Sequence, residues 1–313
     1  RQLESYLQVL DEQPGSSFTA LLAQEQIYAQ LDRDLQSWAE DEDGVATRRQ
    51  RRQVADEIRR CWRFQGLAGR AHSNGDPGMV LVLSGLDAAE LPDLSGHEGF
   101  SHVSEMTLSH MQLRDLPTGF LQPFGSLLTL NLDSNRLTVV PPALSALPHL
   151  RELTLSRNEL HIDAAGLALL GQMRQLRMLD LSENPLGMFG LALDQMPRLR
   201  QLGLRNVGLT EIPRHLELGV SLDYVDLRDN QITALPLSLR NRAGQWRRRL
   251  ALVGNPLPEQ YRDLWIDPSW TSESEAESDV HDGTRWLERL DDASRVTRAA
   301  QWDRLQAEPG SAD

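Results

Sequence analysis

Between residues 81 and 257 the hydrophobic positions of the chain recur in a fixed frame, Leu-x-Leu-x-x-slot-x-Leu. In the copy "LRELTLSRNEL", Leu153 and Leu155 are two residues apart, so on a strand both side chains point to one face. Glu152, Thr154 and Ser156 alternate with them and point to the opposite face. The frame predicts one short strand per copy, and the copies begin at Leu81, Met106, Leu130, Leu153, Leu179, Leu202, Val225 and Leu250.

The slot of this frame holds asparagine in five copies, at Asn135, Asn158, Asn184, Asn230 and Asn255, and holds Leu86, Met111 and Val207 in the others. A short amide side chain at this point can bond the backbone as it turns out of the strand, and stacked copies predict a ladder of such bonds. Successive copies are 23 to 26 residues apart, and this period with this frame is the signature of a leucine-rich repeat solenoid. We therefore expect an α/β fold of about eight repeats, with a parallel sheet on its concave face and a core made by stacking neighbours.

The segments between the predicted strands are expected to form the convex side of the solenoid. Five copies carry an apolar residue followed by proline, which disfavours a continuous helix there: Leu91-Pro92, Leu116-Pro117, Val140-Pro141, Ile212-Pro213 and Leu235-Pro236. The copy beginning at Leu153 lacks this pair, and its segment "AAGLALLGQMRQL" predicts one or two helical turns.

Helical periodicity precedes the repeats and returns after them. Residues 16–40 and 47–64 each carry an apolar stripe, typical of the helical cap that an exposed first repeat requires. Residues 271–283 have the polarity and acidity of a linker. The predicted domains are a helical N-terminal region and cap (1–75), the solenoid (76–262), an acidic linker (263–283), and the start of a helical domain that continues beyond Asp313 (284–313).

The composition and net charge of the chain disfavour some classes of binding partner. The chain has 313 residues and a net charge of −13, which disfavours generic binding to nucleic acid or anionic membranes. No apolar run reaches the length of a membrane-spanning helix, and the first 30 residues lack the pattern of a secretory signal. All 32 basic residues are arginine, which reflects either codon bias or a chain protected from modification on lysine.

Candidate chemistry is sparse. Cys61 is the single cysteine, so no internal disulfide can form, and it falls on the apolar side of a predicted helix, where a structural thiol is expected. The segment "HEGFSH" (97–102) is one residue too long for the zinc-binding His-Glu-x-x-His pattern. We expect no catalytic residue, no metal and no cofactor in this chain.

The C-terminal sequence carries a family resemblance. A leucine-rich repeat block, a linker and then "RWLERL" and "AQWDRLQAEPGSAD" resemble the start of the NEL domain of IpaH-type bacterial ubiquitin ligases, above all their larger pseudomonad-like relatives. This resemblance implies a secreted effector in the host cytoplasm, whose repeats select a substrate and whose catalytic domain, beyond Asp313, accepts ubiquitin from a loaded conjugating enzyme on a Cys-x-Asp cysteine. No Cys-x-Asp occurs in this chain, so it is expected to lack ligase activity of its own. The alternatives are a non-enzymatic adaptor or scaffold, acting for instance in the bacterial cytoplasm, and the recognition region of a toxin whose activity lies upstream.

The outward-facing strand positions are the candidate binding site for a protein partner, because the core does not require them. We expect acidic side chains in the middle of this face and arginines toward its end, at Asp133, Glu152, Asp180, Arg205, Tyr224, Asp226, Arg228 and Arg249. Asp133, Glu152 and Asp180 stand on successive predicted strands, so we expect their carboxylates in one row at about 4.8 Å spacing. The arginines are expected to continue this row with reversed sign.

Overall fold

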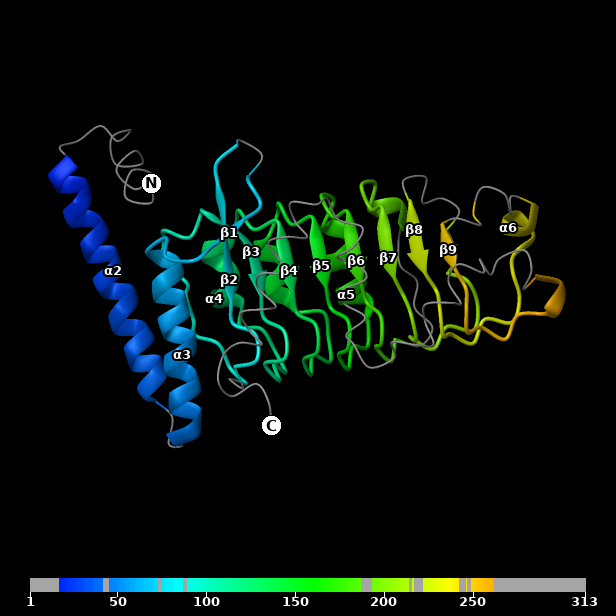
Figure 1. Ribbon diagram of the computed structural model, residues 1–313, viewed down its shortest axis with the longest axis horizontal. Helices are drawn as coiled ribbons and strands as arrows, with labels where there is room; N and C mark the ends of the chain where they lie inside the picture. The colour runs from blue at the N-terminus through cyan, green and yellow to red at the C-terminus, as the bar shows by residue number, and fades with distance from the viewer. Residues whose placement is uncertain are drawn as a thin grey trace.

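In the part of the chain that the structure describes, one sheet of nine strands, in chain order from β1 to β9, runs along the solenoid (Figure 1). The computed structural model describes residues 17–41, 45–72, 75–86, 89–186, 193–213, 216, 222–241, 246 and 249–261. The strands are β1 (Leu67–Gly69), β2 (Gly78–Val82), β3 (Val103–Thr107), β4 (Thr129–Asn131), β5 (Glu152–Thr154), β6 (Met178–Asp180), β7 (Gln201–Gly203), β8 (Tyr224–Asp226) and β9 (Leu250–Ala251). Strands β2 to β9 are all parallel, so the predicted leucine-rich repeat solenoid is confirmed.

The repeat frame sets the register of the sheet. Leu130 lies opposite Leu153, Leu153 opposite Leu179, and Leu179 opposite Leu202 on the neighbouring strands. All four side chains are fully buried and belong to one hydrophobic core that continues through every repeat. Each repeat alone would leave this apolar face in water, so the stacking of neighbours stabilises the array.

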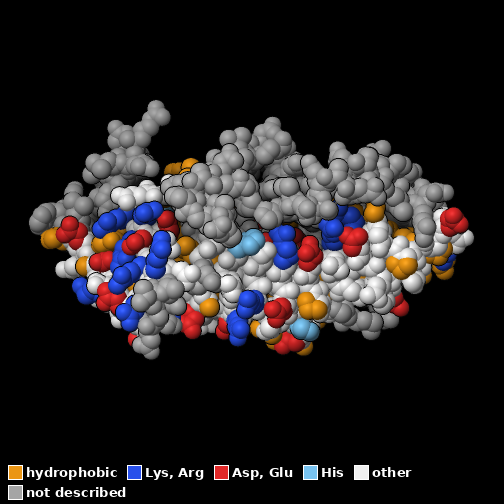
Figure 2. All heavy atoms as spheres, turned by 60° about the horizontal axis from the view of Figure 1, so that its bottom comes forward, with side chains coloured by type: hydrophobic (Ala, Val, Ile, Leu, Met, Phe, Trp, Pro, Cys, Tyr) orange, Lys and Arg blue, Asp and Glu red, His pale blue; other side chains and the backbone are white. Residues whose placement is uncertain are grey.

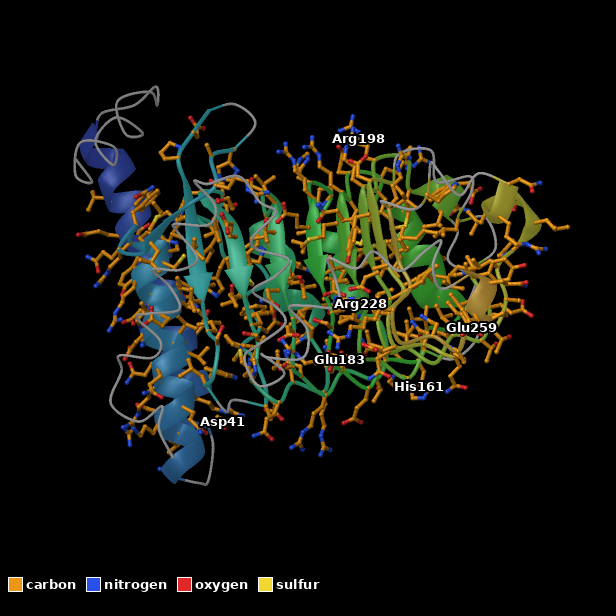
Figure 3. All side chains as sticks on the ribbon, turned by 45° about the vertical axis from the view of Figure 1, so that its right-hand side comes forward. Asp41, His161, Glu183, Arg198, Arg228 and Glu259 are labelled. Atoms are coloured by element: carbon orange, nitrogen blue, oxygen red, sulfur yellow. The ribbon has the colours of Figure 1, made fainter. Side chains whose placement is uncertain are left out.

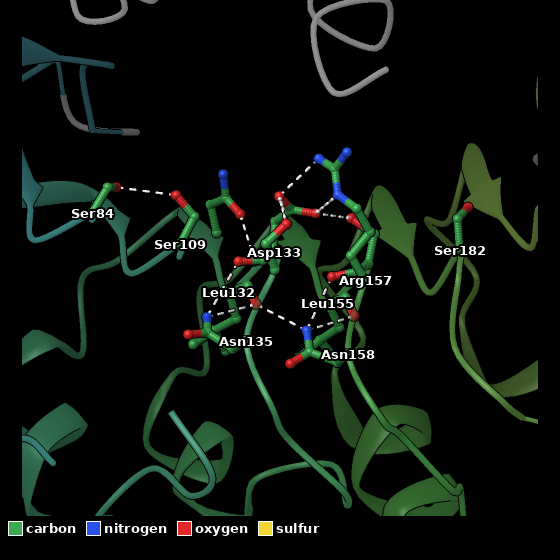
Figure 4. A network of polar contacts seen from close by, with 12 residues as sticks. Ser84, Ser109, Leu132, Asp133, Asn135, Leu155, Arg157, Asn158 and Ser182 are labelled. Atoms are coloured by element: carbon green, nitrogen blue, oxygen red, sulfur yellow. Dashed lines mark hydrogen bonds and ion pairs between the residues drawn. The ribbon is translucent and has the colours of Figure 1, made fainter. Parts of the chain in front are cut away.

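The asparagine ladder predicted from the slots is present. Asn158 donates through Nδ2 to the carbonyls of Leu132 and Leu155, both at 3.0 Å (Figure 4). Its Oδ1 accepts from the Leu137 N–H at 3.0 Å. The same pattern recurs at Asn135, Asn184, Asn230 and Asn255. Each amide therefore joins its own turn to the preceding repeat and satisfies backbone groups inside the core.

One residue before each slot the backbone takes a left-handed conformation. These residues are Gly85, His110, Ser134, Arg157, Glu183, Asn206, Asp229 and Gly254, with φ between 49° and 79°. Six of the eight are not glycine, although the left-handed region disfavours residues with a Cβ. The turn geometry that the ladder imposes therefore outweighs the local backbone preference in six repeats.

Short helices cover the convex side of the sheet. They are α4 (Thr118–Leu121), η1 (Gln122–Phe124), η2 (Pro142–Ala146), α5 (Ala164–Gln172), η3 (Leu193–Gln195) and α6 (Leu237–Asn241). Helices α4 and η2 start directly after Pro117 and Pro141, whose fixed φ suits the residue before a first turn. Helix α5 is the one predicted in the copy without a proline pair, and the Asp163 carboxylate caps it by accepting the Gly166 N–H at 2.8 Å.

Two long helices, α2 (Ser17–Glu40) and α3 (Val45–Trp62), cover the N-terminal end of the solenoid (Figure 1). The predicted apolar stripes meet there, and Leu31, Leu35 and Ile58 are buried in the same core as the repeats. The Trp62 Nε1–H donates to the Glu98 carbonyl at 2.9 Å and so joins α3 to the first repeat. Arginine and acidic side chains are intermixed over this end of the molecule (Figure 2). This helical cap is as the sequence predicts.

Strand β1 is not part of the repeat frame and was not predicted. It pairs antiparallel with β2, with Leu67 opposite Val80. Arg70, directly after β1, donates its backbone N–H to Glu105 Oε1 at 2.7 Å and pairs with Glu152 through Nη1 at 2.6 Å. The hairpin thus covers the otherwise open edge of the sheet and extends onto its concave face.

None of the described helices is long and apolar enough to cross a membrane. The predicted linker (263–283) and the predicted start of a further domain (284–313) lie outside the described residues.

Candidate protein-binding surface

The concave face presents its side chains in three rows, which the sheet register defines. The first row holds Thr129, Glu152, Met178, Gln201 and Tyr224, and the second holds Asn131, Thr154, Asp180, Gly203 and Asp226. The third row, directly after the strands, holds Asp133, Ser156, Ser182, Arg205 and Arg228. We refer to the three rows together as the sheet face.

The expected single row of carboxylates is wrong. Glu152 lies opposite Met178, and Asp180 lies opposite Thr154, one row further along the strands. Asp133 lies in the third row, so the three acids lie in three different rows. Each of these acids holds a different position within its own repeat. Their presence on successive strands therefore does not place them in one row. Within the third row the expected order is present, with Asp133 before Arg205 and Arg228.

Most of the charged side chains of the sheet face are paired within the chain. Asp133 accepts from Ser156 Oγ at 2.6 Å and from Arg157 Nε and Nη2 at 3.0 and 2.9 Å (Figure 4). Glu152 pairs with Arg70 of the N-terminal hairpin at 2.6 Å. Both carboxylates are buried, so these middle acids are not the open acidic zone that the sequence suggested.

The same holds at the C-terminal half of the face. Arg228 binds Asp226 through Nε and Nη2, at 2.9 and 2.6 Å, and Asp226 is 0% exposed. Arg228 is itself 9% exposed, so it is not the freely accessible charge that the sequence suggested, and it instead compensates the buried carboxylate of Asp226. Tyr224 is also buried. Arg205 is half-buried and pairs with Asp229 at 2.6 Å.

Arg249 differs from these residues because it is exposed, with its guanidinium 6.0 Å from the centre of the Trp246 ring. Of the eight predicted site residues, Arg205 and Arg249 therefore keep accessible charge, while the other six are buried.

Asp180 has a different environment. Its carboxylate is 7% exposed, it accepts the Ser182 N–H at 3.0 Å, and no arginine among the described residues forms an ion pair with it. Burial and, to a smaller extent, the charges of Asp226 and Asp133 raise the pKa of Asp180, while the hydrogen bonds from Ser182 lower it. The resulting pKa is about 6. A Cβ added at Gly203 would lie 2.1 Å from Asp180 Oδ1, so glycine opposite Asp180 leaves the space that this carboxylate occupies.

The uncharged positions between these groups are the accessible part of the sheet face. Asn131, Thr154 and Gln201 are half-buried and lie on β4, β5 and β7. Ion pairs hold the neighbouring long side chains in place, so this surface is ordered before any partner arrives. Preformed surfaces lose less conformational entropy on binding than mobile ones.

The other sequence candidates lie at the joint between the helical cap and the first repeat. Cys61 is buried, and burial, together with the charge of Glu57, raises the pKa of its thiol to about 12. His97 pairs with Asp34 at 3.1 Å, and the His102 ring bonds the Cys61 carbonyl at 2.9 Å. His97 and His102 thus connect helices to the repeat, and within the described residues no group of histidine, cysteine and acidic side chains is arranged to hold a metal ion.

Comparison with known proteins agrees with this architecture. The sequence profile of the Leucine rich repeat family matches residues 101–160. The chain is 37% identical over 123 residues to mouse podocan-like protein 1, covering 38% of this chain and 21% of that protein. It is 33% identical over 194 residues to the transforming growth factor beta activator LRRC32 of Pongo abelii, covering 52% of this chain and 29% of that protein. The chain thus spans less than a third of the length of these relatives.

Solved structures with a similar fold include human trophoblast glycoprotein, with a TM-score of 0.43, 23% identity, and coverage of 57% of this chain and 78% of that one. An internalin from Listeria monocytogenes has a TM-score of 0.41 at 21% identity, covering 60% of each chain.

The register and the asparagine ladder define a leucine-rich repeat solenoid, and the profile match over residues 101–160 agrees with it. Its repeats form a protein–protein interaction domain, and the sheet face is its candidate binding surface.

Proposed function

We propose that the solenoid recognises a protein partner through the sheet face, with the contact centred on β5 to β7. The observation that carries this proposal is the combination of half-buried Thr154 and Gln201 with flanking side chains already fixed in ion pairs. The site would be rigid and polar at its centre, and charged where Arg205 and Arg249 lie. A partner that fits it carries hydrogen-bonding groups opposite the centre and carboxylates opposite the C-terminal repeats.

Site-specific photo-cross-linking tests this proposal. A photoreactive amino acid replaces Gln201 on the sheet face or, as the matched control, the exposed Gln172 at the end of α5 on the convex side. We expect a cross-linked protein of discrete mass from position 201 and none from position 172. Cross-linking from position 172 alone would place the partner on the convex side and contradict the proposal.

We further propose that the partner is a substrate of a cysteine-type ubiquitin ligase, and that the natural protein is a bacterial effector acting in the host cytoplasm. The support is the resemblance of residues 284–313 to the start of the NEL domain, together with a chain that contains no lysine. A lysine-free recognition domain would escape modification by the ligase it serves. A non-enzymatic adaptor or a toxin with upstream activity remains the competing function.

Reconstitution separates these functions. The 313-residue chain and the product of its complete natural gene, referred to as the full protein, are each incubated with ubiquitin, activating enzyme and conjugating enzyme. Ubiquitin chains are expected from the full protein and none from the 313-residue chain, because its single thiol, Cys61, is buried. An inactive full protein supports the adaptor, and a ubiquitin thioester on Cys61 would contradict both the proposal and the structural role of this residue.

A further inference from the structure

Five arginines gather at the edge of the sheet where the strands of the middle repeats begin. Arg151, Arg177 and Arg200 each directly precede a strand, β5, β6 and β7 respectively. Arg174 and Arg198 lie three and two residues further upstream in the last two of these repeats. Figure 3 shows Arg198 at this edge, projecting away from the ribbon. We call these five residues the arginine ridge.

Backbone hydrogen bonds hold part of the ridge in a column. The Arg177 N–H donates to the Arg151 carbonyl at 2.6 Å, and the Arg200 N–H donates to the Arg177 carbonyl at 2.8 Å. The three Cα atoms therefore follow one another at the inter-strand spacing of about 4.8 Å. The repeat, and not a flexible loop, sets the separation of these charges.

The ridge is a positive cluster with few carboxylate partners, in a chain whose net charge is −13. Arg200 pairs with Asp223 at 3.0 Å, but both side chains are about 60% exposed, and such surface pairs are weak. Within the part of the chain that the structure describes, no carboxylate pairs with Arg151, Arg174, Arg177 or Arg198. The Arg198 guanidinium donates to the neutral Gln175 side chain instead.

The arginines also repel one another. Burial lowers the pKa of Arg151, and the charges of Arg177, Arg70 and Arg198 lower it further, while the charge of Glu152 opposes this shift with a smaller effect. Like charges held close together raise the free energy of the folded protein, and a bound anion relieves that cost. Arg174, Arg177, Arg198 and Arg200 are exposed, so an anion can reach them.

We propose that the arginine ridge is a second binding surface, distinct from the sheet face, and that it takes a short acidic segment of a partner protein. Arginine suits this role because its planar guanidinium binds a carboxylate through two parallel hydrogen bonds. The column from Arg151 to Arg200 spans two inter-strand steps, about 10 Å, which matches three or four residues of extended peptide.

A peptide fits this ridge better than a larger polyanion does. Proteins that bind single-stranded nucleic acid add aromatic platforms on which the bases stack, and no Phe, Tyr or Trp stands next to the ridge arginines in residues 148–152, 172–178 or 196–201. A long nucleic acid or an anionic membrane would also meet the acidic remainder of the chain, which repels it. A short segment avoids that repulsion.

The test measures binding of a fluorescein-labelled peptide of six glutamates to the whole chain by fluorescence anisotropy at low salt. The triple variant Arg174→Gln, Arg177→Gln and Arg198→Gln should bind this peptide about tenfold more weakly. The matched control removes the same charge elsewhere, through Arg49→Gln, Arg114→Gln and Arg136→Gln, at exposed positions on α3 and in the segments that follow β3 and β4. It should bind as the wild type does.

Each outcome decides the proposal. Equal loss in both triple variants would mean that net charge alone attracts the peptide, and the proposal would be overturned. A 12-nucleotide single-stranded DNA that binds the ridge more tightly than the peptide would overturn the choice of a protein segment. Thermal unfolding of both triple variants should match the wild type because the substituted side chains are exposed. The single variant Arg177→Gln, which perturbs the chain less, should show a smaller loss of peptide binding than the ridge triple variant.

Discussion

The Asp133 carboxylate accepts two hydrogen bonds from the Arg157 guanidinium of the next repeat, from Nε at 3.0 Å and Nη2 at 2.9 Å. Arg157 is the left-handed residue of its turn, so the turn geometry itself directs its side chain toward the preceding repeat. Arg205 and Asp229 form the same contact further along the solenoid with the charges exchanged, at 2.6 Å. Neighbouring repeats thus form an ion pair between the same two positions, and either position can carry the acidic residue.

These two pairs should differ in strength because their exposure differs. Double-mutant cycles to alanine, measured by urea unfolding, should give a larger coupling energy for Asp133–Arg157, whose carboxylate side chain is 9% exposed. Arg205–Asp229, at 30% and 43% exposed, should contribute no more than about 1 kcal/mol. A coupling at Arg205–Asp229 that equals or exceeds the other would contradict the view that burial sets the strength of this contact.

The asparagine ladder predicts a cost for losing one rung. Asn158→Ala leaves the carbonyls of Leu132 and Leu155 and the N–H of Leu137 without their amide partner inside the core. The free energy of unfolding should fall by about 1–3 kcal/mol. Asn241→Ala removes the same side chain from an exposed position at the end of α6 and should change stability little. Equal effects of the two substitutions in chemical denaturation would argue against the ladder.

Asp180 should make stability depend on pH. Its pKa is about 6 in the folded chain, against 3.8 for an ordinary aspartate, so the folded state takes up a proton between these values that the unfolded state does not. Stability should therefore rise as the pH falls through 6, and Asp180→Asn should remove this rise. The gain of the wild type over the variant between pH 7.5 and pH 4.5 is expected to be about 2 kcal/mol.

Unfolding by urea at several pH values measures this difference, with Asp194→Asn on an exposed carboxylate as the control. If the wild type and Asp180→Asn show parallel pH profiles, the carboxylate of Asp180 ionises in the folded chain as it does in solution.

The left-handed turns predict opposite outcomes for two glycine substitutions. A Cβ at Gly85 or at Gly125 meets no atom within 4 Å, but φ is +72° at Gly85 and −57° at Gly125. Gly85→Ala should destabilise the chain by about 1 kcal/mol, because alanine disfavours this conformation. Gly125→Ala should be neutral or slightly stabilising, because it restricts the unfolded chain instead. Thermal unfolding of the pair measures the contrast, and a stabilised Gly85→Ala variant would contradict the backbone assignment of the turn.

The parts of this structure that the sequence predicts are those where one residue type has one role. Leucines such as Leu153 recur in a fixed frame because an apolar side chain must fill the core there, and asparagines such as Asn158 recur because their amides bond the turn. The left-handed position carries residues as different as Ser134 and Glu183, so no residue type marks it. What the repeats share at this position is the backbone geometry, which the neighbouring repeats on both sides set.

The sequence predicted which side chains lie on the candidate surface, but not which of them are accessible. The two-residue alternation shows which side chains leave the core, but it does not show their partners. Glu152 pairs with Arg70, which lies outside the repeats and 82 residues away in the chain. Asp226 is paired with Arg228, two residues further along its own repeat, yet both were expected to face a partner. Exposure depends on such contacts, and the sequence pattern contains no record of them.

The central claim, that the sheet face recognises a protein partner, is tested most directly by the affinity of the partner cross-linked at position 201 for two variants. Gln201→Trp adds bulk at the centre of the sheet face, and Gln172→Trp adds the same bulk on the convex side. By isothermal titration calorimetry, Gln201→Trp should weaken binding by at least about tenfold, while Gln172→Trp should bind with the affinity of the wild type. Unchanged affinity of Gln201→Trp, with loss of binding by Gln172→Trp, would contradict the account.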